Sequence, residues 1–65
     1  MTQEEFDAMP VLMRPWMARR ALGVGQEELR NVRSAKPDVA TRLKGMKEWR
    51  YHKSVIARMT KLKMK

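Results

Sequence analysis

The chain has 65 residues, and its fifteen Lys and Arg against seven Asp and Glu give a net charge of +8. It contains no cysteine, which excludes a disulfide framework and a cysteine-ligated zinc site. No apolar run approaches the roughly 20 residues of a bilayer-spanning helix, and the first residues lack the pattern of a signal peptide. We therefore expect one soluble domain, residues 1–65, in the cytoplasm.

The basic residues are unevenly distributed. Residues 1–13 contain three acidic side chains and no Lys or Arg, so this leader carries −3, whereas residues 14–65 carry +11. A body this basic attracts polyanions before any specific contact forms. Nucleic acid is the first partner that this charge predicts. An anionic membrane surface is the second, but the apolar face of the Lys-rich tail is too short to favour it.

The leader is predicted to contain a short helix. Thr2 followed by Glu5 resembles a capping box, so we expect a helix over Thr2–Asp7 that ends before Pro10. Val11–Met13 is then an apolar link to the next element.

Arg14–Leu22 is the first strongly predicted helix. Pro15 suits its first turn, and Gly23 suits the left-handed residue that follows a helix. Helical spacing predicts one buried stripe and places Arg19 and Arg20 toward water. The expected stripe consists of Trp16, Met17, Ala21 and Leu22.

Gln26–Ala35 is the second strongly predicted helix, entered through Gly23-Val24-Gly25 with Gly25 as a weak cap. Leu29 and Val32 are its only strongly apolar residues. They are three positions apart, so they form a thin buried edge and leave a broad polar face. Such a helix is suited to laying its polar side on a partner.

Lys36-Pro37-Asp38 ends this helix, and two alternating segments follow. We expect Val39–Leu43 and Glu48–His52 to form a two-stranded hairpin around a turn at Lys44–Lys47. In the first strand, Val39, Thr41 and Leu43 would share one face. In the second strand, Trp49 and Tyr51 would lie together on the apolar face. Ser54 is predicted to cap a last helix, in which Val55, Ile56, Met59 and Leu62 have helical spacing; Lys61–Lys65 should fray.

This order predicts an α+β fold, a small winged helix-turn-helix with helices and one two-stranded β-hairpin as the wing. A short turn between two helices is typical of a helix-turn-helix, whose second helix enters the DNA major groove. Arg pairs with guanine, Asn with adenine and Glu accepts from cytosine. The predicted DNA-binding residues of the second helix are Gln26, Glu27, Arg30, Asn31, Arg33 and Ser34. Those of the wing are Arg42, Lys44 and Lys47, and Arg19 and Arg20 are further phosphate contacts.

Other interpretations of these residues remain open. The polar faces could be solvated surfaces in which Glu27 or Glu28 pairs with a nearby arginine. Trp49 could stack on unpaired bases, but packing against the helices is favoured in so small a chain. A single histidine, His52, does not make a metal site, and no nucleophile–base pair or phosphate loop indicates an enzyme. We expect no cofactor and no small-molecule substrate.

Two stretches resemble a known family. Met17–Val24 followed by Gln26–Arg30 is similar to the core of MerR-like winged helix-turn-helix domains, and Lys47–Ile56 is similar to the end of the wing and the next helix in phage excisionases of the lambda type. The resemblance covers about 14–59. Gly25, Glu28 and Val32 depart from the family's usual Ser or Thr, Thr and aromatic residue.

The resemblance implies an excisionase, or recombination directionality factor: a non-catalytic protein that binds adjacent DNA sites cooperatively, bends DNA and directs an integrase toward prophage excision. Its partners would be double-stranded DNA, an integrase and neighbouring copies of itself, in the cytoplasm or nucleoid of a host cell. A phage transcriptional regulator is the alternative within DNA binding. From another class, the chain could be a protein-interaction module that docks through its tail residues Lys61, Leu62, Lys63 and Met64.

Overall fold

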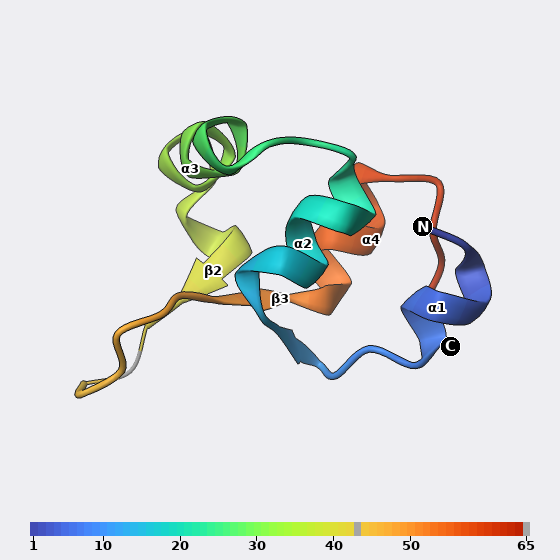
Figure 1. Cartoon of the computed structure of the whole chain (residues 1–65), viewed down its shortest axis with the longest axis horizontal. Helices are drawn as coiled ribbons and strands as arrows, with labels where there is room; N and C mark the ends of the chain where they lie inside the picture. Colours follow the sequence, from blue (N-terminus) through green and yellow to red (C-terminus); the bar gives the residue numbers. More distant parts are fainter. Residues whose placement is uncertain (43, 65) are drawn as a thin grey trace.

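The computed structural model describes residues 1–42 and 44–64, which form a small α+β domain with four α-helices and a three-stranded antiparallel sheet (Figure 1). The helices are α1 (Gln3–Asp7), α2 (Pro15–Leu22), α3 (Gln26–Ala35) and α4 (Lys53–Met59). The strands are β1 (Leu12–Met13), β2 (Ala40–Thr41) and β3 (Arg50–His52), and a 3₁₀ helix, η1 (Pro37–Val39), precedes β2. Leu43, which was predicted to lie on one face of the first hairpin strand, and Lys65 are outside the described residues.

Helices α1, α2 and α3 begin and end where local signals predict. Thr2 is the N-cap of α1, and its hydroxyl accepts a hydrogen bond from the Glu5 amide at 3.1 Å. Pro15 occupies the first turn of α2, and Gly23 follows it with φ 69° in the left-handed region. Gly25 is the N-cap of α3. All these predictions are confirmed.

The sheet has one strand more than predicted. Its order is β1-β3-β2, with Met13 and Ala40 flanking Tyr51 on either side. Val11–Met13 was expected to be an apolar link, but its last two residues form β1. Two residues are too few to show an alternating pattern, and the partner strand lies almost forty positions later, so no local signal marks this strand.

The hairpin strands are shorter than the sequence predicts. Pro37 opens a 3₁₀ turn that includes Val39, so β2 begins only at Ala40, and Val39 and Ala40 are both buried. The predicted single face of Val39 and Thr41 is therefore wrong. β3 runs from Arg50 to His52 rather than from Glu48 and leads directly into α4, with His52 as its N-cap. Ser54 lies in the first turn of α4 and is not its cap.

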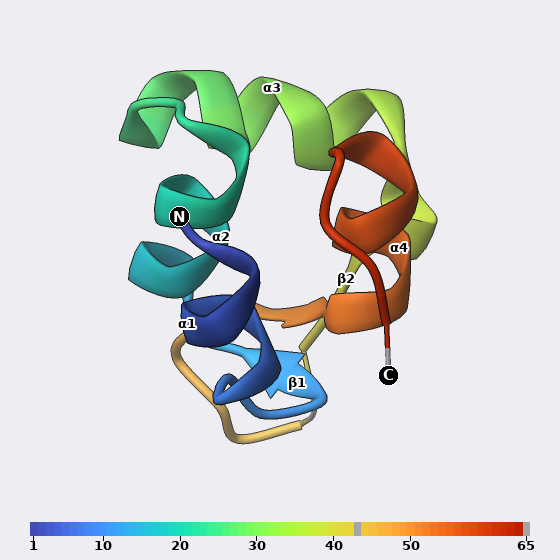
Figure 2. The same ribbon diagram turned by 90° about the vertical axis from the view of Figure 1, so that its right-hand side faces the viewer.

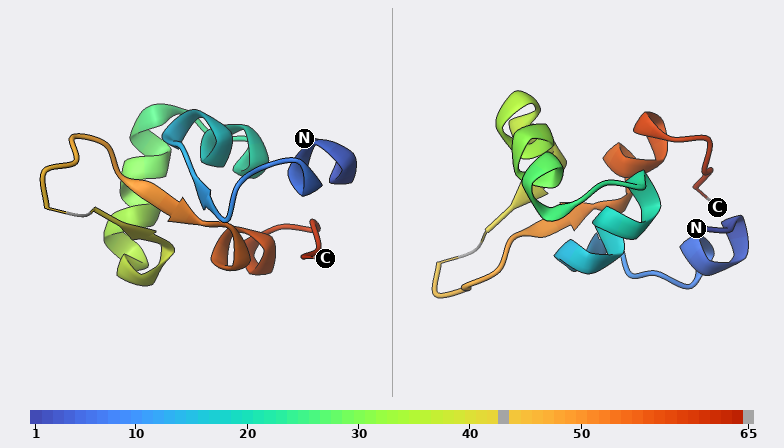
Figure 3. Two further views of the ribbon diagram at one scale, coloured as in Figure 1. Left: turned by 90° about the horizontal axis from the view of Figure 1, so that it is seen from below. Right: turned by 45° about the horizontal axis from the view of Figure 1, so that its top comes forward.

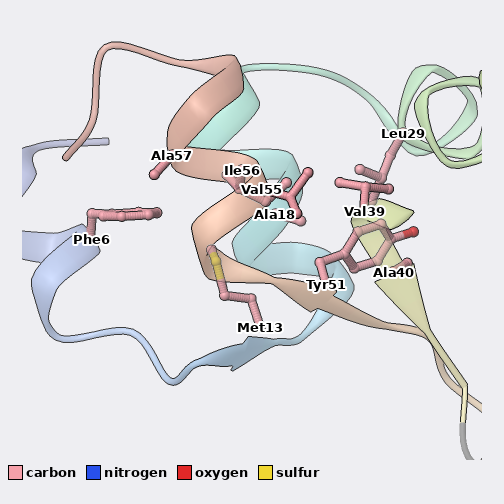
Figure 4. Close-up of a cluster of buried hydrophobic side chains, with 10 residues drawn as sticks. All are labelled: Phe6, Met13, Ala18, Leu29, Val39, Ala40, Tyr51, Val55, Ile56 and Ala57. Carbon is pink, nitrogen blue, oxygen red and sulfur yellow. The ribbon is translucent and has the colours of Figure 1, made fainter. Parts of the chain in front are cut away.

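The core extends along the molecule between the helices and the sheet (Figure 4). Phe6 lies at one end, near Ala57 of α4, and Leu29 lies with Val39 at the other, near Tyr51. Ala18 is the fully buried residue of α2, whereas Met17, Ala21 and Leu22 are only partly buried. Trp16 was expected in this stripe, but it is 53% exposed. The small side chain of Ala18 lets α2 pack against the sheet and α4, and this rotates Trp16 outward.

The leader and the tail are attached to the body. Lys53 is 8% exposed, and its ammonium donates to the carbonyl oxygens of Met9 at 2.9 Å and Asp7 at 3.4 Å, behind the end of α1. The Gln3 side chain donates to the Lys63 carbonyl at 2.7 Å and accepts from the Lys63 amide at 2.8 Å. α4 ends at Met59, yet Leu62 packs on the core from the tail. The tail, which was expected to fray, therefore contacts the body of the domain through Leu62 and Lys63.

Candidate nucleic-acid interface

α3 lies across the ends of α2 and α4 (Figure 2), and most of its residues are exposed. Leu29 is its one fully buried residue, at 2% exposure, and Val32 and Arg33 are half-buried. The remaining polar residues face solvent, as the thin apolar edge predicts. They are Gln26, Glu27, Glu28, Arg30, Asn31 and Ser34.

The turn before α3 sets the position of that helix. Gly23 and Val24 both donate backbone hydrogen bonds to the Arg19 carbonyl, at 2.8 and 3.1 Å, and this closes the end of α2. Val24 is partly buried against the core. The Glu28 carboxylate accepts from the Gly25 amide at 3.5 Å. Glu28 therefore acts as the reciprocal half of a cap at a position where no Ser or Thr side chain is present.

A groove of about 780 Å³ separates α3 from the hairpin and the start of α2. Six of the eleven predicted DNA-binding residues line it, from three elements that are distant in the sequence. These six are Arg19, Gln26, Glu27, Arg30, Arg33 and Lys47. Pro15, Leu29, Glu48, Trp49 and Tyr51 complete the lining. Glu48 is engaged with Arg50 at 3.0 Å, so its charge is already matched.

The other five predicted DNA-binding residues do not line this groove. Asn31 and Ser34 are exposed on α3, and Lys44 is exposed in the loop that projects beyond the body of the domain between β2 and β3 (Figure 3). Arg42 lies at the base of this loop, where it stacks on Trp49.

Arg20 lies on a different face, between α1 and α2. Its guanidinium donates to the Glu5 carboxylate at 2.8 Å. This hydrogen bond lowers the pKa of Glu5 below its ordinary value and raises that of Arg20. A second hollow here is lined by Trp16 and Arg19 together with Glu5, Met9, Arg20, Gly23 and Val24. Arg20 is thus paired with an acid and does not line the α3 groove, whereas its neighbour Arg19 lines both hollows.

The indole of Trp49 is the feature of the site that the sequence did not indicate. The guanidinium carbon of Arg33 lies 4.6 Å from the centroid of the ring, and that of Arg42 lies 5.0 Å from it. Arg33 also donates to the Tyr51 hydroxyl at 3.4 Å. Trp49 is half-buried and packs beside α3, as expected. Its ring also makes cation–π contacts with both arginines. Arg33 and Trp49 are sixteen positions apart, and no local pattern relates them.

The four tail residues that were predicted to contact a partner differ in their surroundings. Lys61 is exposed and Met64 is 45% exposed, but Leu62 is half-buried on the core and the Lys63 backbone is bonded to Gln3. Three other large apolar side chains are exposed between residues 11 and 16, at β1 and the start of α2. There Val11 is 71% exposed, Leu12 39% and Trp16 53%.

Comparisons with known proteins identify no relative: no family model, no curated protein and no solved structure matches this chain. Within residues 1–42 and 44–64, no helix combines the length and hydropathy of a bilayer-spanning segment. In the same residues, no three His, Asp or Glu side chains lie together in a way that could hold a metal ion.

Proposed function

We propose that this protein binds double-stranded DNA as a winged helix-turn-helix. In this proposal α2, the Gly23–Gly25 turn and α3 form the helix-turn-helix, and the segment between β2 and β3 is the wing. The observation that carries it is the groove in which the polar face of α3 lies beside basic residues of α2 and the wing. The four cations Arg19, Arg30, Arg33 and Lys47 outnumber its two acids, Glu27 and Glu48, one of which is already paired.

The exposed residues of α3 have the chemistry of base reading. The DNA major groove is about 12 Å wide and admits one helix. Arg30 carries the fork of donors that pairs with guanine, Asn31 can pair with adenine, and Glu27 can accept from cytosine. Gln26 and Ser34 extend the polar face by one turn in each direction. These contacts would set the sequence preference.

Phosphate contacts would come from the basic residues around α3. Lys44 and Lys47 on the wing and Arg19 on α2 are exposed, and none of them has an ion-pair partner among the described residues. Such contacts fix the register of a protein on the duplex without reading its sequence. Arg20 is the weakest member of the predicted set, because DNA would have to compete with Glu5 for it.

Within DNA binding, we propose an excisionase-like architectural role rather than that of a dimeric repressor. This part of the proposal rests on the resemblance of residues 47–56 to phage excisionases, together with that of residues 17–24 and 26–30 to MerR-like winged helix-turn-helix domains. The segment 11–16, in which the apolar side chains of Val11, Leu12 and Trp16 are exposed, supports an additional contact with a protein such as an integrase. It is a better candidate for that contact than the tail, because Leu62 is already used by the core.

Selection of bound duplexes from a random DNA pool at near-physiological salt tests the proposal. We expect enrichment of a short motif, and direct repeats spaced by about one helical turn would indicate an array of adjacent copies. An inverted repeat would indicate a dimeric regulator instead. If no sequence is enriched, only charge-driven binding is left, sequence-specific DNA binding is refuted and the protein-interaction role becomes the better proposal.

A further inference from the structure

We propose that Arg33 and Arg42, held together on the ring of Trp49, form a clamp for the backbone phosphates of duplex DNA, with Trp49 as its positioning residue. This inference deepens the proposed function and rests on it. It assigns to Trp49 a role that neither core packing nor base stacking describes.

The three residues come from three different segments. Arg33 lies in the last turn of α3, Arg42 directly follows β2, and Trp49 directly precedes β3. Both guanidinium carbons lie within 5.0 Å of the centroid of the same ring. The indole therefore connects α3 with both arms of the hairpin. A phosphate bound by the two arginines would be bound by the helix and the wing at once.

The stacking leaves the donors of the arginines available. An arginine stacks through the flat face of its guanidinium, whereas its five N–H donors lie in the plane and point outward. Arg33 uses one donor for the Tyr51 hydroxyl at 3.4 Å. Neither Arg33 nor Arg42 has a carboxylate partner among the described residues. In-plane donors of this kind match phosphate oxygens, to which a guanidinium can bind in a bidentate manner.

The arrangement also favours an anion by its charge. Two like charges that share one aromatic ring repel each other, and a phosphate between or beside them relieves that repulsion. The ring meanwhile restricts two long side chains that would otherwise lose rotamer freedom on binding. Trp49 would thus raise the affinity without touching DNA.

The experiment measures the affinity of a fluorescent duplex, taken from the random-pool selection, by anisotropy at several salt concentrations. The variants are Arg33→Ala, Arg42→Ala, Trp49→Leu, Trp49→Phe and the combinations of Trp49→Leu with both arginine changes. Arg58→Ala is the charge-matched control, because Arg58 is exposed on α4 and does not line the groove. In a Trp16→Phe background, the emission of Trp49 reports independently whether removal of each arginine changes its surroundings.

Each arginine variant should flatten the dependence of log affinity on log salt by about 0.9, and Arg58→Ala should leave it unchanged. Trp49→Leu should weaken binding by about tenfold when both arginines are present and hardly at all when both are alanine, because its effect passes through them. Trp49→Phe should recover part of the loss, since phenylalanine keeps a ring but attracts cations less strongly.

Two results would overturn the clamp and leave the proposed DNA binding intact. One is an unchanged salt dependence in both arginine variants, and another is an equal effect of Trp49→Leu with and without the arginines, as expected for a core residue alone. If Trp49→Leu does not fold, the arginine variants and Trp49→Phe still decide. A parent protein that fails to bind the duplex refutes the proposed function as well, whereas a parent that binds with arginine-independent salt dependence refutes only the clamp.

Discussion

Replacement of Lys53 by methionine tests how the leader is held. The Lys53 ammonium is buried behind α1, 2.9 Å from the Met9 carbonyl oxygen, 3.4 Å from that of Asp7, and 4.9 Å from the centroid of the Phe6 ring. Methionine keeps an unbranched apolar chain of similar length, so the packing changes little. What is lost is the charge and its donors.

The expected cost follows from these contacts. A hydrogen bond to a charged group contributes about 1.5–3 kcal/mol, and the cation–ring contact contributes roughly 0.5–1 kcal/mol. The variant no longer buries a charge, which offsets part of this loss. We therefore expect Lys53→Met to lower the free energy of unfolding by about 2 kcal/mol. For a domain of this length the total is roughly 3–10 kcal/mol, and Tm should fall by about 8–16 °C.

Thermal and urea unfolding followed by circular dichroism measure this change. Lys61→Met is the matched control, because Lys61 is exposed and should shift the free energy by less than about 0.5 kcal/mol. Hydrogen exchange should also accelerate in α1 before it does so in α4. A Lys53→Met protein as stable as the Lys61→Met control would refute the reasoning, since the ammonium would then contribute nothing beyond its stem.

Three further predictions concern the interface, the turn and pH. Arg30→Ala should weaken DNA binding by about 1–3 kcal/mol and relax the sequence preference at one base. Lys44→Ala should weaken binding to all sequences and reduce the slope of log affinity against log salt by about one. If both variants bind DNA like the parent, the assignment of these residues is wrong. Gly23→Ala should lower the free energy of unfolding by roughly 1 kcal/mol in thermal unfolding, because its φ of 69° is unfavourable for alanine. An added Cβ meets nothing within 4 Å, so backbone strain is the whole cost. Gly25→Ala is the control, because the negative φ of Gly25 imposes no such strain. The hydrogen bond from Arg20 lowers the pKa of Glu5, so the stabilisation that Glu5→Gln removes should be present at pH 7, decline from the ordinary glutamate value of about 4 and be lost as the pH falls through the lowered pKa of Glu5. A parent–variant difference that grows on acidification, measured by urea unfolding at low salt, would have the wrong sign.

The helices were predictable because their signals are local. Pro15 and Gly23 mark the two ends of α2 within eight residues, and Leu29 with Val32 defines the buried edge of α3. The orientation of α2 was not predictable in this way. Hydrophobicity favoured Trp16 as its buried residue, but close packing selected Ala18, whose small side chain carries little sequence signal.

The sheet and the centre of the groove depend on pairing between remote segments. β1 is defined by its bonds to β3, not by its own two residues, and the 3₁₀ turn at Pro37 shifted the start of β2. The polar face of α3 identified four of the eleven residues that line the groove: Gln26, Glu27, Arg30 and Arg33. The stacking of Arg33 and Arg42 on Trp49 arises only when helix and hairpin come together, so residue spacing could not indicate it.

The reciprocal hydrogen bonds between Gln3 and Lys63 have a practical consequence for engineering. They hold the first and last segments of the chain together on one side of the domain, away from α3 and the wing (Figure 1). A fluorophore, affinity tag or fused reporter on either end would therefore emerge away from the proposed DNA surface. The same proximity makes the chain suited to circular permutation, because a short linker could join the ends without crossing the groove.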